Sequence, residues 1–164
     1  MQVPDSAKIF MQNQRAFMVG KGDNVWHEIF ISDLARLFLL LGEAAANGGD
    51  PATWNDQGYY LVENGTVVWG KLMREIAREA HRQGLLQSKE VASLTAEEVD
   101  KLMPHGKLMV GTNSRGEAIR ARKLLGWKPK GPTLQETLPE VVEIEGRGLN
   151  LVKGHAAKVE QRTA

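Results

Sequence analysis

The segment from Val67 to Gln83 is the sequence feature that most limits what this chain can fold into. Its apolar residues recur every three or four positions, and charged residues fill most positions between them. Because an α-helix has about 3.6 residues per turn, this spacing gathers the apolar side chains on one face. Those residues are Trp69, Leu72, Met73, Ile76, Ala77 and Ala80. The spacing predicts an amphipathic helix that packs one face against a hydrophobic core.

Segments on both sides of this helix predict alternating strands and helices. Residues 16–19, 26–31 and 58–62 contain strand-forming apolar and aromatic residues. Residues 33–46 predict a helix whose wide apolar arc should be mostly buried. Residues 95–103 open with the Thr-x-x-Glu pattern of a capping box and predict a short helix. The sequence therefore predicts an α/β protein with mainly helices and a few short strands.

The composition excludes several classes of protein. The 21 basic and 20 acidic residues nearly cancel, whereas a nucleic-acid-binding protein normally has a basic excess. The absence of Cys excludes disulfides, iron–sulfur centres and a catalytic thiol. The longest apolar run, Leu37 to Leu41, is far below the roughly 20 residues of a membrane span, and the first residues do not resemble a signal peptide. We expect a cytoplasmic protein with no nucleic-acid or membrane partner.

Two short stretches begin a nucleotide-binding motif without completing it. Gly20-Lys21-Gly22 resembles the start of the dinucleotide fingerprint, but Val25 stands where the third glycine is required. Residues 65–71 have the glycine and lysine spacing of a phosphate-binding loop, but Leu72 replaces the Ser or Thr that ligates magnesium. Neither stretch predicts a cofactor site, and the scattered histidines predict no metal site.

Three blocks of sequence occur in the order typical of one enzyme family. Residues 24–35 read NVWHEIFISDLA, residues 58–65 read GYYLVENG, and residues 123–129 read KLLGWKP. They resemble the V-H-V-D-D-L-A block, a late strand and the C-terminal K-x-L-G-W-x-P signature of the extended short-chain dehydrogenase/reductases. This is the NAD-dependent epimerase/dehydratase family, and the likeness is greatest to its fungal members. It runs from residue 2 to about residue 142 and covers only the C-terminal half of the family pattern.

The resemblance implies a partial Rossmann-type fold that retains the substrate-binding portion. In that family the other half supplies the glycine-rich phosphate turn and the catalytic Ser, Tyr and Lys, which have no counterpart here. NAD(P) is therefore implied as the family's cofactor, but this chain alone holds no cofactor and no catalytic residue. One substrate-binding domain is expected over residues 1–146, followed by a polar tail at 147–164.

Three functions are compatible with this pattern. The first is a truncated NAD(P)-dependent oxidoreductase that keeps the half binding a small metabolite. The second is a stand-alone binding pseudoenzyme, and the third is a cofactor-free isomerase of metabolite biosynthesis. Whether the chain is an enzyme stays open at this point.

Four residues are predicted to bind the substrate. Asn24, Trp26 and His27 lie where a turn meets the strand that resembles the family's pocket wall. His27 offers a hydrogen bond to a substrate hydroxyl, and Trp26 offers a surface for the substrate's body. Arg115 precedes a predicted helix and offers a positive charge to an anionic group. Each also has a structural alternative, which is core packing for Trp26 and simple solvation for His27 and Arg115.

Four other residues are expected to be structural. Ser32 and Asp33 suit the start of a helix, where an oxygen-bearing side chain accepts a backbone N–H, so Asp33 is not assigned to catalysis. Trp69 and Trp127 are expected to anchor the core.

The predicted strand at 58–62 suggests association with another chain. Its neighbours in the family come from the half that is missing here, and an unpaired apolar strand edge promotes association. We expect a homo-oligomer or pairing with a full-length relative.

Overall fold

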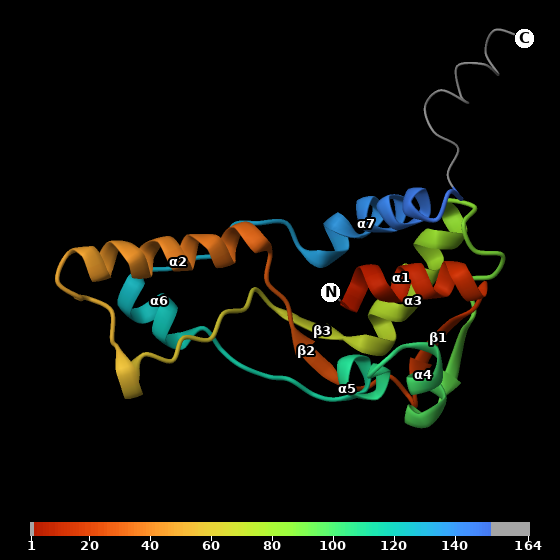
Figure 1. Ribbon diagram of the computed structural model, residues 1–164, viewed down its shortest axis with the longest axis horizontal. Coiled ribbons are helices and arrows are strands. Elements are labelled where there is room, and N and C mark those ends of the chain that lie inside the picture. The colour runs from red at the N-terminus through yellow and green to blue at the C-terminus, as the bar shows by residue number, and fades with distance from the viewer. Residues whose placement is uncertain (1, 152–164) are drawn as a thin grey trace, which may run out of the picture. The chain divides into compact units, whose positions relative to one another are not determined.

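The computed structural model describes residues 2–151, which separate into two units by their internal contacts (Figure 1). Unit 1 is formed by residues 2–24, 68–113 and 137–151. Unit 2 is formed by residues 25–67 and 114–136. Each unit is therefore assembled from segments that are far apart in the sequence.

Unit 1 is built around a pair of parallel strands. Ala16 lies opposite Val91 and Val19 lies opposite Leu94. Parallel neighbours cannot be joined by a tight turn, and here the helix α3 lies between them in the chain. The elements are α1 (Gln2–Asn13), β1 (Ala16–Val19), α3 (Trp69–Arg82), β4 (Val91–Leu94), α4 (Ala96–Leu102), α5 (Gly106–Gly111) and, from Thr137 onward, α7 (Leu134–Gly148).

The helix predicted from its apolar spacing is α3. Every member of the predicted apolar face is buried, with no more than 3% of any side chain exposed. This face packs against α1 and β1. Phe10 and Phe17 add an edge-to-face ring contact, with 5.0 Å between the ring centroids. The prediction of a buried amphipathic face is confirmed, and so is that of a core position for Trp69.

A close contact between two glycines fixes the start of α3. The N–H of Gly70 donates to the carbonyl of Gly22 at 2.8 Å. Gly22 has a φ of +71°, and a Cβ there would lie 2.5 Å from the Cα of Gly70. Only glycine fits both constraints. Gly22, which began an incomplete nucleotide fingerprint, is thus explained by packing.

Unit 2 is a smaller assembly around the helix α2. Its elements are β2 (Val25–His27), α2 (Ile31–Ala46), the short 3-10 helix η1 (Asn55–Gln57), β3 (Thr66–Val68), which ends at the unit boundary, and α6 (Ile119–Leu125). β2 pairs with β3, and α2 lies beside α6 (Figure 1). The core of the unit consists of Leu37, Ala118, Ala121 and Trp127, so the core position predicted for Trp127 is confirmed.

Three expectations about unit 2 are wrong. The strand expected at 26–31 ends at His27, and α2 begins at Ile31 with no side-chain cap. Residues 58–62 form no strand, because no partner strand within residues 2–151 lies alongside them; Tyr60 packs on the core from an irregular segment. The helix α2 is also largely exposed, with only Asp33, Leu37 and Ala44 buried.

The predicted fold class is confirmed in its general form. The described residues are mostly helical with a few short strands, which is an α/β architecture. Thr95 and Glu98 form the predicted capping box at the start of α4. The expected boundary at residue 146 falls inside α7, and residues 152–164 of the expected tail lie outside the described residues. Within residues 2–151 no helix is both long and apolar enough to cross a membrane.

Candidate functional site

Asn24, the first of the predicted substrate-binding residues, makes contacts within unit 1. Its side-chain amide donates to the carbonyls of Val110 and Thr112, each at 2.9 Å. Both hydrogen bonds tie the loop after β1 to the end of α5. The amide N–H groups are therefore engaged with backbone, and a role in substrate binding stays a prediction.

The other predicted residues lie in unit 2. Trp26 and His27 are half-buried in β2, and Arg115 is exposed in the segment before α6. Nδ1 of His27 is shielded from solvent and has no hydrogen-bond partner among residues 2–151. None of the four predicted residues lines the cleft described below. Their assignment to a substrate remains a prediction.

Asp33 has a structural role that differs from the expected helix cap. Its carboxylate accepts the backbone N–H groups of Lys130 and Gly131 at 2.8 and 2.9 Å. Its carbonyl accepts the indole N–H of Trp127 at 2.9 Å. The side chain is 5% exposed, and burial of a carboxylate is tolerated when such donors satisfy it. Asp33 therefore holds the segment after α6 against the start of α2.

Glu63 forms a second buried carboxylate contact in unit 2. Its side chain accepts a short hydrogen bond from Arg122 and backbone N–H groups of Ala118 and Gly65, each at 3.1 Å. Arg122 also donates to the Glu63 carbonyl at 3.1 Å. Burial alone raises the pKa of Glu63, but these donors outweigh it and hold the pKa below its usual value. The pair fastens the irregular segment before β3 to α6.

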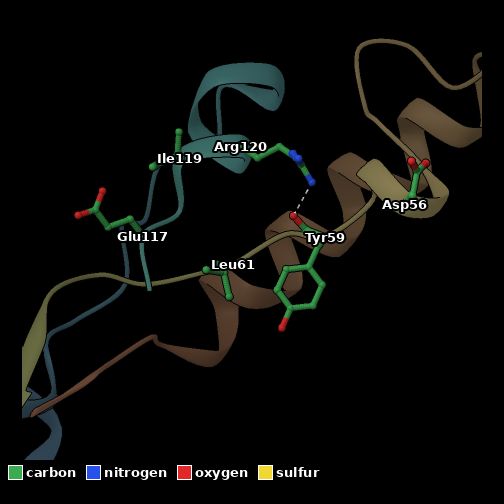
Figure 2. A pocket seen from close by; sticks show the side chains of 6 residues that line it. All are labelled: Asp56, Tyr59, Leu61, Glu117, Ile119 and Arg120. Atoms are coloured by element: carbon green, nitrogen blue, oxygen red, sulfur yellow. Dashed lines mark hydrogen bonds between the residues drawn. The ribbon is translucent and has the colours of Figure 1, made fainter. Parts of the chain in front are cut away.

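A cleft of about 320 Å³ opens in unit 2 (Figure 2). One side is formed by η1 and the residues that follow it, and the other side is formed by the start of α6 and the residues just before it. The residues that line it are Asp56, Tyr59, Leu61, Glu117, Ile119 and Arg120. All of them belong to unit 2. Tyr59 and Ile119 are strongly exposed, at 77% and 63% of their surface. The cleft is accessible, and it joins apolar surface with charged groups.

Arg120 is held in place by the segment opposite α6. Its guanidinium donates to the carbonyl of Tyr59 at 2.8 Å and to Oε1 of Gln57 at 3.4 Å. Figure 2 shows the first of these bonds crossing from α6 to the irregular segment. The guanidinium carbon also lies 5.8 Å from the centroid of the Tyr60 ring. A guanidinium has five N–H donors, so these two bonds leave donors for a ligand.

The cleft suits binding of a small amphipathic molecule. Arg120 supplies hydrogen-bond donors and positive charge, which favour a carboxylate or a carbonyl oxygen. Leu61 and Ile119 supply apolar surface for the body of the molecule. Asp56 and Glu117, at opposite ends of the cleft in Figure 2, supply acceptors for hydroxyl or amino groups. This arrangement is suited to holding and orienting such a ligand.

No metal-binding cluster is found in the described part of the chain: residues 2–151 contain no group of three or more His, Asp and Glu side chains arranged to hold an ion. The residues of the cleft were not among those predicted from the sequence to form a site. Tyr59 and Arg120 are 61 positions apart, and neither belongs to a recognisable motif. No local signal could have brought them together.

Comparison with known proteins identifies one informative relative. A protein of an Acremonium species named Oxidase ucsJ is 39% identical over 143 residues, a match that covers 83% of this chain. The match covers 41% of the oxidase, so the chain spans about two fifths of the length of that relative. No model of a known protein family matches the chain, and no solved structure matches it.

These comparisons correct the family suggested by three blocks of sequence. The chain matches no model of the extended short-chain dehydrogenase/reductase family, and its relative is named as an oxidase. The predicted membership is therefore wrong. The middle block was expected to be a strand, but residues 58–62 form none. NAD(P) was implied only through that family, so no residue of this chain is assigned to it.

Proposed function

We propose that this chain contributes the substrate-binding part of an oxidoreductase and that the cleft of unit 2 binds its small-molecule substrate. The observation that carries the proposal is the 39% identity to a protein named as an oxidase, over 83% of this chain. A match of this extent within the chain supports a shared role for the matched region. We do not assign the whole activity of the relative to this chain, because the chain spans only 41% of the relative's length.

The contacts of Arg120 support the choice of the cleft. Arg120 is oriented by Tyr59, Gln57 and the Tyr60 ring before any ligand arrives. A donor that is already oriented loses little freedom on binding, which favours recognition of an acidic or carbonyl oxygen. Leu61 and Ile119 then contact the apolar part of the substrate. Oxidation itself requires an electron acceptor, and none of the described residues is assigned to that step.

An exchange of segments tests the redox part of the proposal. The region of the Acremonium oxidase that matches this chain is replaced by the corresponding residues of this chain, and turnover of the oxidase's substrate is measured. We expect a folded chimera that retains oxidation activity. A folded chimera without activity, beside an active parent, contradicts the proposal and favours a binding protein or a cofactor-free isomerase.

A substitution in the cleft tests the binding part. In the chimera, Arg120→Gln removes the charge but keeps an amide donor, and we expect the KM to rise about tenfold or more with a smaller change in kcat. Arg78→Gln is the matched control, because Arg78 is an exposed arginine of α3 in unit 1. Equal kinetic constants for the two variants contradict a role for the cleft.

A further inference from the structure

The helix α2 presents an apolar face that the other elements of unit 2 leave exposed. Ile31, Phe38 and Leu39 are 71%, 67% and 50% exposed. Smaller residues on the same side of the helix are also exposed; these are Ala35, Gly42, Ala45 and Ala46. An exposed apolar surface of this kind marks an interaction site more often than an isolated exposed side chain does.

The arrangement of this face follows from helical geometry. At about 100° per residue, the exposed apolar residues fall within one continuous arc, opposite the buried residues Leu37 and Ala44. No charged residue lies within the arc. Arg36 and Glu43 are exposed and are seven positions apart, so both lie along the same border of the face. One border of the apolar face therefore carries a positive charge at Arg36 and a negative charge at Glu43.

We propose that a second copy of this chain covers the apolar face of α2, with the two α2 helices antiparallel. When the twofold axis passes near Leu39, the border that carries Arg36 and Glu43 on one helix lies beside the same border of the other helix. Arg36 of each copy then lies close to Glu43 of the other copy. In the antiparallel pair, the charged border of one helix is therefore complementary to the same border of the other helix, which runs in the opposite direction.

Steric fit supports the same pairing. Gly42 lies in open space, because a Cβ added there would meet nothing within 4 Å. In the antiparallel pair, the Phe38 ring of one copy lies near Gly42 of the other, where the absence of a side chain leaves room for a ring. Large side chains that fill gaps beside small residues are typical of close helix packing. The face is self-complementary in shape as well as in charge.

Sedimentation of the intact chain tests the pairing. We expect a species of twice the 18.1 kDa mass of one chain, which dissociates on dilution. Phe38→Glu is expected to weaken association by roughly thirtyfold or more, the effect of losing a central apolar anchor. Ile144→Glu is the matched control, because Ile144 is an exposed isoleucine of α7 that lies outside the proposed interface. A wild-type chain that stays monomeric overturns the proposal.

Exchange of the two charges tests the orientation. Arg36→Glu and Glu43→Arg each place like charges opposite one another and are expected to weaken association. The double variant restores opposite charges and is expected to recover most of the lost affinity. A double variant no better than either single variant overturns the antiparallel pairing, even if a dimer exists.

Crosslinking gives a readout that does not depend on a disruptive substitution. The natural chain has no Cys, so Leu39→Cys introduces a single thiol near the proposed twofold axis. Oxidised glutathione accepts the two electrons as two such thiols form one disulfide. We expect a covalent dimer from Leu39→Cys at a far greater rate than from the control Ile144→Cys, since a disulfide requires the two Cβ atoms to approach closely. Equal rates overturn the proposal.

Discussion

The helices α3 and α2 have similar lengths, of 14 and 16 residues, but they are buried to very different extents. In unit 1, α3 buries seven of its 14 residues, about two in each turn, from Trp69 to Ala80. In unit 2, α2 is the more apolar sequence and yet buries only Asp33, Leu37 and Ala44. Apolar content alone therefore does not decide burial. How much of a helix is buried depends on the surface area of the other elements that pack against it.

The two units also differ in what stabilises them. Unit 1 has a core of large side chains, including Phe10, Phe17 and Ile76. Unit 2 has the small cluster around Leu37 and Trp127, and relies in addition on the buried carboxylates of Asp33 and Glu63. We therefore expect unit 1 to be sensitive to loss of volume, and unit 2 to loss of hydrogen bonds and to acid.

The largest expected effect is loss of volume in unit 1. Ile76 is fully buried in α3, so Ile76→Ala should lower the free energy of unfolding by about 2–5 kcal/mol. Urea denaturation followed by circular dichroism measures the change. Ile144→Ala, at an exposed site in α7, should change it by less than about 0.5 kcal/mol. Similar losses for both variants would show that α3 does not anchor the core.

The next largest effect is loss of the Glu63 contact in unit 2. Glu63→Gln removes the negative charge beside Arg122 and should cost about 2–3 kcal/mol, because the hydrogen bonds at the buried Glu63 side chain lose their charged acceptor. Hydrogen exchange should show faster exchange in α6 while α3 keeps its protection. Glu140→Gln, at an exposed position of α7, is the control. Uniformly faster exchange in both units would contradict the separate stabilisation of unit 2.

A smaller effect is expected at Asp33. In Asp33→Asn only one side-chain oxygen remains, so one of the N–H groups of Lys130 and Gly131 loses its acceptor. The expected cost is about 1–2 kcal/mol. Thermal unfolding measures it, with Asp23→Asn, at an exposed loop position, as control. A variant as stable as the control would mean that the segment after α6 is held by Trp127 alone.

The smallest effect is on the pH dependence of stability. The pKa of Glu63 is lower in the folded protein than its usual value of 4.5, so the unfolded chain takes up a proton first as the pH falls. The stabilising contribution is therefore complete above the usual pKa and is lost as the pH falls through the lowered folded pKa.

Comparison with Glu63→Gln isolates this contribution. Glu79 in unit 1 also has a lowered pKa, caused mainly by its hydrogen bond to Arg82, so the wild-type protein loses stability in acid from both units. The variant should show a weaker acid dependence than the wild-type protein in urea denaturation at a series of pH values. Parallel curves for the two proteins would remove Glu63 as the source of acid sensitivity in unit 2.

Features that depend on neighbouring residues could be predicted from the sequence. The apolar spacing of α3 extends over several turns, and the capping box of Thr95 and Glu98 satisfies backbone donors within one turn. Both signals act within a few positions of the chain, so they hold whatever surrounds them. The strand β1 was also predicted with its observed bounds.

Features that depend on distant partners could not be predicted in this way. Residues 58–62 have strand-forming side chains, but a strand needs a hydrogen-bonded neighbour, and the described part of the chain places none beside them. Leu108 to Val110 are consecutive apolar residues of a kind that a short strand also contains, yet they belong to α5. Asp33 had the composition of a helix start, yet its carboxylate meets donors almost 100 positions later in the chain.

By itself, the sequence determined the α/β class, the position of α3 and the burial of its apolar face, because periodic spacing and helix caps are local properties. Only the tertiary structure decided the candidate site, because Arg120 meets Tyr59 across 61 positions of the chain. The tertiary structure also decided that α2 stays largely exposed. The apolar composition of α2 predicts burial, but the elements packed against it cover only a small part of its surface. Local periodicity orients side chains within an element, whereas burial and site geometry depend on what other elements bring against it.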